Sequence, residues 1–138
     1  MKSETSFINK YGEFVRSTTS DESLRTEVMM DRMLGLQMSN EDTQFSQLLT
    51  ASIGMQAESG EFSEIIKKVI FQGKDWNEHE KFHLKRELGD VLWYWVQGCQ
   101  ALGFEPEEVI NENIRKLSAR YPHGFDVLRS ENREEGDI

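Results

Sequence analysis

The sequence predicts an all-α fold, an antiparallel helical bundle. It contains only two prolines, Pro106 and Pro122, has few runs of β-branched residues, and lacks the Asn-Gly and Asp-Gly pairs that turn a β-hairpin. Apolar residues recur at helical spacing, and short connections between these segments favour antiparallel neighbours. A chain of 138 residues, of which 37% are hydrophobic, is most simply a single domain over residues 1–138.

The first forty residues predict a helical segment of two amphipathic helices. One covers about residues 5–18 and the other about residues 22–38, for which Ser20 or Asp21 is a candidate N-cap. The apolar face of the first helix is formed by Phe7, Ile8, Tyr11 and Phe14.

The core of the domain is expected over about residues 43–122, and it begins with a long helix over about residues 43–71. Gly73 follows this helix, as glycine often does where a helix ends. The helix carries apolar residues at Phe45, Leu48, Leu49, Ile53, Phe62, Ile65, Ile66 and Val69.

Two further helices complete the core. Asn77 is a candidate N-cap for a helix that runs to about Leu102, and Glu80, three residues after Asn77, is the expected partner in a capping box. The next helix opens at Pro106 and ends at about Arg120. The polar tail, residues 129–138, is expected to be frayed.

Composition excludes several classes of function. The formal net charge is −9, which repels a nucleic-acid backbone, and no basic patch stands out, so no nucleic-acid partner is expected. There is no run of eighteen apolar residues and no apolar signal segment, so we expect no membrane partner and a cytoplasmic location. The single cysteine, Cys99, excludes an internal disulfide and is expected in the core. An acidic chain suits divalent cations.

Two pairs of acidic residues at helical spacing are candidate ligands for a divalent cation. Glu58 and Glu61 lie three residues apart in the long helix, and Glu87 and Asp90 lie three apart in the following one, so each pair shares a helix face. Both faces also carry apolar residues, so we expect all four acids to point inward. Buried acids repel one another unless a cation binds them. Carboxylates without histidine or thiolate favour Mg²⁺ or Mn²⁺; the alternative is neutralisation by Lys and Arg.

The stretch HEKFH offers a competing metal site. His79 and His83 lie four residues apart with Glu80 between them, the spacing of the helical zinc motif of metallopeptidases. Glu108 or Glu112 remains possible as a third ligand. However, Glu80 already has an expected role as capping partner, and the flanking residues are charged, so exposed histidines are the expected reading.

The segments MQAESGEFSEIIKK and KRELGDVLWYW together resemble the all-α nucleotide pyrophosphohydrolases of the MazG type. Their signature is Glu-x-x-Glu, a spacer, and Glu-x-x-Asp, and here 25 residues separate Glu61 from Glu87. The resemblance covers about residues 43–122. It implies magnesium-dependent hydrolysis of a nucleoside triphosphate to the monophosphate and pyrophosphate. We expect deoxynucleotides as substrates, and a guanosine alarmone is also conceivable.

The resemblance also implies roles for individual residues. Both acidic pairs would hold Mg²⁺, with Mn²⁺ as the alternative, and Glu61, or Glu58 in its place, would orient or deprotonate the attacking water. The sequence NIRKLSARYP matches the Lys and Arg that follow the metal helices of the family. The expected substrate contacts are Lys116, Arg120, Asn113, Tyr94 and Lys68.

The apolar residues cover more than one face of the helices. Trp93 and Trp95, for example, lie on opposite flanks of Tyr94. Two or three long helices bury such surfaces poorly alone, so a homodimer or homotetramer is expected. The other class of function that fits the sequence is a non-catalytic acidic helical module that assembles with a partner.

Overall fold

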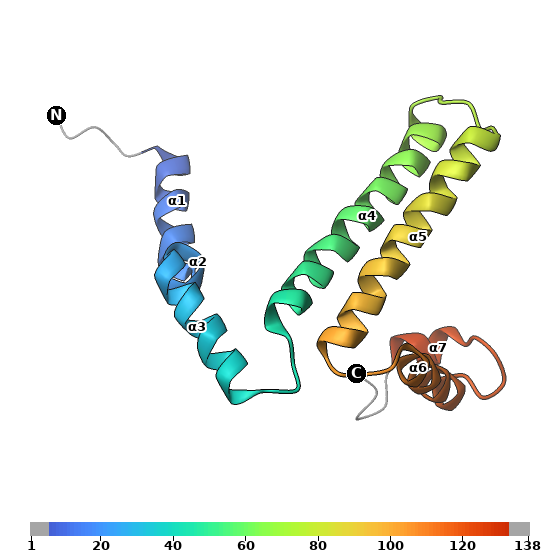
Figure 1. Ribbon diagram of the computed structural model, residues 1–138. Helices are drawn as coiled ribbons and strands as arrows, with labels where there is room; N and C mark the ends of the chain where they lie inside the picture. Colours follow the sequence, from blue (N-terminus) through green and yellow to red (C-terminus); the bar gives the residue numbers. More distant parts are fainter. Residues whose placement is uncertain (1–5, 133–138) are drawn as a thin grey trace. The chain divides into compact units, whose positions relative to one another are not determined.

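The computed structural model describes residues 6–132, and within them the chain is all-α, as predicted. It contains seven helices and, in place of strands, one isolated bridge between Pro122 and Gly124. The chain divides into two compact units, Met1–Glu41 and Asp42–Ile138 (Figure 1). No helix in the described residues is both long and apolar enough to cross a membrane.

The first unit contains three helices where two were expected. They are α1 (Phe7–Thr18), α2 (Asp21–Leu24) and α3 (Thr26–Ser39). The prediction of one continuous helix over residues 22–38 is wrong, because Arg25 adopts an extended conformation, φ −135° and ψ 114°, that ends α2 and precedes α3. Neither glycine nor proline marks this break, so the periodicity contained no signal for it.

No side chain of these three helices is buried within the unit. The apolar face predicted for α1 is therefore present but uncovered, and Phe7 is 84% exposed. Ser20 occupies the N-cap position of α2, although its hydroxyl meets Ser23 Oγ at 3.2 Å rather than a backbone N–H.

The second unit is organised by a long antiparallel hairpin of α4 (Phe45–Phe71) and α5 (Glu78–Ala101) (Figure 1). The two helices approach closely because small residues line their seam. Gly54 on α4 is buried against the ring of Tyr94, and Gly98 on α5 is buried beside the methyl group of Ala51. This close approach brings the acidic residues of the two helices within reach of one another.

The loop of the hairpin is defined at both ends by its sequence. Gly73 has φ 69°, a conformation that glycine adopts at little cost after a helix. Asn77 caps α5 as predicted, and its Oδ1 accepts hydrogen bonds from the N–H of His79 at 2.9 Å and of Glu80 at 3.3 Å. The second half of the capping box is wrong: the Glu80 carboxylate turns to Lys74 and His79 instead of the N–H of Asn77.

Two shorter helices follow, α6 (Pro106–Arg120) and α7 (Val127–Glu131). Pro106 opens α6 as predicted, and Asp126 caps α7 by accepting a hydrogen bond from the N–H of Arg129 at 3.0 Å. The tail that we expected to be frayed thus begins inside α7. Residues 133–138 lie outside the described residues.

Candidate metal and nucleotide site

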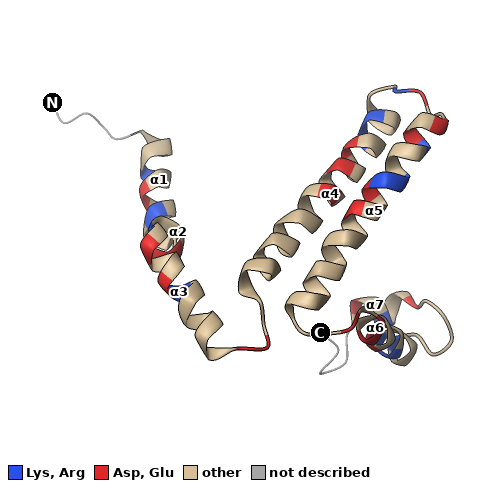
Figure 2. Cartoon of the chain, viewed as in Figure 1, with Lys and Arg blue, Asp and Glu red and all other residues tan. Residues whose placement is uncertain are grey.

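The predicted acidic residues come together across the α4–α5 hairpin. Carboxylate oxygens of Glu58, Glu61 and Glu87 all lie within 4.8 Å of one another. Asp90, one turn after Glu87, is near enough to act electrostatically on Glu58. Acidic residues of both helices lie at a similar level of the hairpin (Figure 2). The structure thus brings together three of the four acids in one cluster, with the fourth beside it.

The burial of these acids differs from the prediction. Glu58 and Glu87 are half-buried, whereas Glu61 and Asp90 are exposed. The prediction that all four point inward is therefore wrong for Glu61 and Asp90. The reason is that only two helices pair here, so side chains at the margin of their seam are not covered by a third helix. A cluster at such a margin is open to a ligand.

The cluster is electrostatically strained. The pKa of Glu58 is raised above its ordinary value, first because its surroundings remove water from it and then because of the charges of Glu61, Asp90 and Glu87. Among the described residues, no lysine or arginine forms an ion pair with any of these four acids. The alternative reading, in which basic side chains neutralise the two helix faces, is therefore not supported.

This donor set fits a hard divalent cation. Carboxylate oxygens from two helices converge without a nitrogen or sulfur donor, and Mg²⁺ and Mn²⁺ prefer such oxygens and complete their coordination with water and substrate phosphates. A divalent cation would also relieve the mutual repulsion that raises the pKa of Glu58.

Tyr94 and Lys68, two of the predicted substrate contacts, have other neighbours in the structure. The Tyr94 ring packs against α4 so tightly that a Cβ atom on Gly54 would lie 2.3 Å from it. Lys68 Nζ lies 3.3 Å from Glu64 Oε1. Tyr94 therefore holds the two helices together one turn beyond Asp90, and Lys68 takes part in a surface ion pair.

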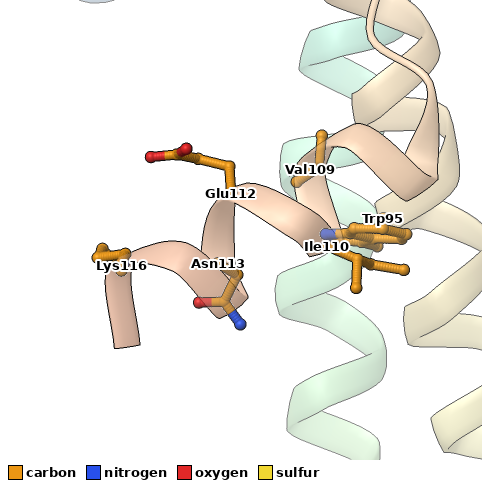
Figure 3. Close-up of a pocket in the computed structure, with 6 residues that line it drawn as sticks. All are labelled: Trp95, Val109, Ile110, Glu112, Asn113 and Lys116. Atoms are coloured by element: carbon orange, nitrogen blue, oxygen red, sulfur yellow. The ribbon is translucent and has the colours of Figure 1, made fainter. Parts of the chain in front are cut away.

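A cavity of about 510 Å³ lies between α5 and α6. It is lined by Trp95, Val109, Ile110, Glu112, Asn113 and Lys116, and Figure 3 shows the Trp95 ring beside Ile110, with Asn113 and Lys116 further along α6. Two predicted substrate contacts, Asn113 and Lys116, are thus placed together. Arg120 does not line this cavity, and its guanidinium carbon lies 5.9 Å from the centre of the Tyr121 ring.

The cavity shows where α6 lies against α5. The two helices meet at Trp95, eight residues or about 12 Å of helix axis beyond Glu87. Trp95 was not among the predicted site residues. Its signal was present in the sequence, because Glu87, Val91 and Trp95 recur every four residues and so follow one stripe of the helix.

The histidine motif also forms a cluster, at the start of α5. Ligand atoms of His79, Glu80 and His83 all lie within 4.8 Å of one another. Glu112, one candidate for a third zinc ligand from α6, instead pairs with Arg115 and lines the Trp95 cavity. Glu112 therefore does not join His79 and His83 as the third ligand of a peptidase zinc centre.

The second unit is thus an all-α helical hairpin on which acidic residues of α4 and α5 converge. The family model of the MazG nucleotide pyrophosphohydrolase domain matches residues 47–125, which include both acidic pairs and all of α6. The chain belongs to this family.

The chain is also similar to the Gene 37 protein of Mycobacterium phage L5. The two are 31% identical over 84 residues, which is 59% of this chain and 73% of the phage protein. No solved structure matches the chain.

Proposed function

We propose that this protein is a Mg²⁺-dependent nucleoside triphosphate pyrophosphohydrolase that releases a nucleoside monophosphate and pyrophosphate, with Mn²⁺ as an alternative cation and deoxynucleotides as the favoured substrates. The observation that carries the proposal is the convergence of Glu58, Glu61 and Glu87 within 4.8 Å, in a chain of the MazG family. We expect the protein to act in the cytoplasm.

The residues of the cluster have distinct tasks in this proposal. Bound Mg²⁺ would supply positive charge to the triphosphate and polarise a water molecule. Glu58, Glu61, Glu87 and Asp90 would hold the cation. Glu61, or Glu58 in its place, orients the water and accepts its proton as the water oxygen bonds to the α-phosphorus. The bond from the α-phosphorus to its bridging oxygen breaks, and pyrophosphate leaves.

The cavity beside Trp95 offers further substrate contacts. Its volume of about 510 Å³ lies within the range of pockets that hold small ligands, and it combines an aromatic ring with the amide of Asn113 and the ammonium of Lys116. We propose that Asn113, Lys116 and Arg120 contact the nucleotide, the two cations through its phosphates. Tyr94, one turn beyond Asp90 on α5, and Lys68, two turns beyond Glu61 on α4, complete the proposed contacts.

The test is pyrophosphate release from a panel of dNTPs, NTPs and ppGpp with Mg²⁺. Glu61→Gln and Asp90→Asn should abolish turnover and leave the helical circular dichroism unchanged, because each removes a cation ligand yet relieves repulsion. Glu64→Gln is the matched control: Glu64 lies on α4 but pairs with Lys67 and Lys68, so this variant should retain activity.

Two outcomes contradict the proposal. Full activity in either ligand variant would refute the cation assignment. Absence of turnover with every nucleotide, together with absence of Mg²⁺ binding, would favour the non-catalytic helical module instead.

We also propose that the active form is a homodimer or homotetramer. Among the described residues no large side chain is fully buried, and the buried apolar residues are Ala51, Leu84, Cys99 and Ala101. So small a core does not stabilise a long hairpin by itself. A second copy covering the exposed apolar faces would supply the missing burial.

A further inference from the structure

A buried carboxylate lies at the tip of the hairpin, outside the acidic cluster. Glu80 is in the first turn of α5 but only 3% exposed. Lys74 Nζ lies 2.8 Å from Glu80 Oε2 and forms an ion pair with it, so a lysine of the preceding loop holds one oxygen of this carboxylate. The pKa of Glu80 is lowered, chiefly by its interaction with Lys74. Glu80 is thus a charged carboxylate that is buried at the start of a helix and whose other oxygen, Oε1, faces His79.

Two histidines border the other oxygen of this carboxylate. His79 Nδ1 lies 3.2 Å from Glu80 Oε1, and the rings of His79 and His83 lie 4.4 Å apart between centroids. Zinc bonds of about 2.0–2.2 Å in a tetrahedron place neighbouring ligand atoms about 3.3 Å apart. The separation of His79 Nδ1 and Glu80 Oε1 therefore suits two ligands of one tetrahedral ion, and His83 is the third donor of the group.

We propose that His79, Glu80 and His83 form a second metal site, which binds Zn²⁺ or a similar transition-metal ion and is distinct from the Mg²⁺ site of the acidic cluster. Imidazole nitrogens favour zinc, cobalt, nickel and copper, whereas Mg²⁺ favours oxygen donors. The two sites thus select different ions by donor type, although His83 and Glu87 lie one helical turn apart on α5.

The position of this site indicates what the ion does. His79, Glu80 and His83 all lie in the first two turns of α5, so an ion that they hold cross-links the start of this helix, next to the ion pair of Glu80 with Lys74 in the hairpin loop. Three protein donors leave a fourth position for water, and the Trp95 cavity lies elsewhere, between α5 and α6. The role is therefore to stabilise the hairpin tip, independently of nucleotide hydrolysis.

The test is a cobalt titration of the full chain in saturating Mg²⁺, which keeps the acidic cluster filled. Tetrahedral Co²⁺ absorbs visible light far more strongly than octahedral Co²⁺, so the band reports this site alone. We expect one Co²⁺ per chain, displaced by Zn²⁺. His79→Ala and His83→Ala should each weaken binding by on the order of tenfold or more.

The matched control is His123→Ala, which removes the third histidine of the chain, located in the α6–α7 connection. This variant and Glu61→Gln should both retain the cobalt band. Glu80→Gln should weaken cobalt binding by on the order of tenfold. Circular dichroism shows whether this variant folds. If Glu80→Gln does not fold, the variants of His79, which is exposed, and of His83, which is half-buried, provide the test.

Three outcomes overturn the proposal: no tetrahedral band in the wild type, a band retained in the His79→Ala/His83→Ala double variant, or a band lost in Glu61→Gln. Since the readout is absorbance and not turnover, failure of this proposal and failure of the proposed hydrolysis are distinguishable.

Discussion

At the scale of single residues, Glu58 links charge crowding to stability. Its pKa is raised in the folded protein by desolvation and by neighbouring acids. A raised carboxyl pKa contributes stability that is present below the ordinary value of 4.5 and lost as pH rises through the folded-state pKa. Without divalent cations, Glu58→Gln should therefore raise the melting temperature relative to wild type, and the gap should widen as pH rises from about 4.5 towards neutrality.

The control for this prediction is Glu64, one turn beyond Glu61 on the same helix. The pKa of Glu64 is lowered by its interactions with Lys67 and Lys68, so its contribution is present at neutral pH and lost as pH falls. Glu64→Gln should thus lower the melting temperature at pH 7 and approach wild type in acid. Identical pH profiles for the two variants would contradict the assigned cause. Added Mg²⁺ should stabilise the wild type more than Glu58→Gln.

Lys116 and Arg120 should matter for catalysis through the phosphates of the substrate. Both lie on α6, four residues apart. Loss of a charge-assisted hydrogen bond in Lys116→Ala or Arg120→Ala predicts kcat/KM lower by on the order of tenfold or more at saturating Mg²⁺. Lys81→Ala, which alters an exposed pair with Glu78, is the control. Wild-type kinetics in both α6 variants would reassign these cations to the surface.

At the scale of elements, the α4–α5 seam depends on the absence of a side chain at Gly54. A Cβ there would lie 2.3 Å from the Tyr94 ring, so either the ring must move or the two helices must separate. Gly54→Ala should lower the free energy of unfolding by about 1–3 kcal/mol, as overpacking does, despite the better helix propensity of alanine.

Gly60, on the same helix, is the matched control because a Cβ there would meet nothing within 4 Å. Gly60→Ala should raise the free energy of unfolding by up to about 1 kcal/mol. Urea unfolding measures both changes. If Gly54→Ala were as stabilising as Gly60→Ala, the close contact with Tyr94 would not exist in solution.

The sequence predicted those elements whose signals are local. Asn77 predicts the start of α5 and Pro106 predicts the start of α6, because helix capping and the geometry of proline act within one helical turn. The break at Arg25 carries no such residue. The burial of Glu80 was not predicted, because it depends on Lys74 in the preceding loop. A capping-box pattern does not show which partner the carboxylate binds.

The acidic cluster was more predictable than the contacts around it. Three-residue spacing places Glu58 with Glu61 and Glu87 with Asp90 wherever the helices lie, and a short loop then aligns the two pairs. The Trp95 cavity depends on how α6 leaves the turn after Gly103, and that angle is set by tertiary packing. Residues contributed by α6 could therefore be named from the sequence, but their position along α5 could not.

At the scale of the whole molecule, the second unit exposes more apolar surface than a free hairpin tolerates. Its large apolar side chains on α4 and α5 that face solvent are Leu49, Ile53, Ile70, Phe71, Phe82, Leu88, Leu92 and Trp93. Burying each such side chain fully contributes about 1.5–3 kcal/mol. Covering even part of this surface would contribute as much as the whole stability of a small domain.

A second copy of the chain is the partner that this surface predicts, because every copy carries the same faces and a symmetric contact covers both at once. Light scattering at micromolar concentration should thus report a dimer or tetramer. Leu92→Glu, which places a charge on an apolar side chain that is 56% exposed, should shift the protein towards monomer and lower its melting temperature together, whereas Lys85→Glu, at an exposed polar position of α5, should change neither. A wild-type protein that is monomeric and yet thermally stable would contradict the prediction, because the small core of the hairpin would then be enough to stabilise the fold.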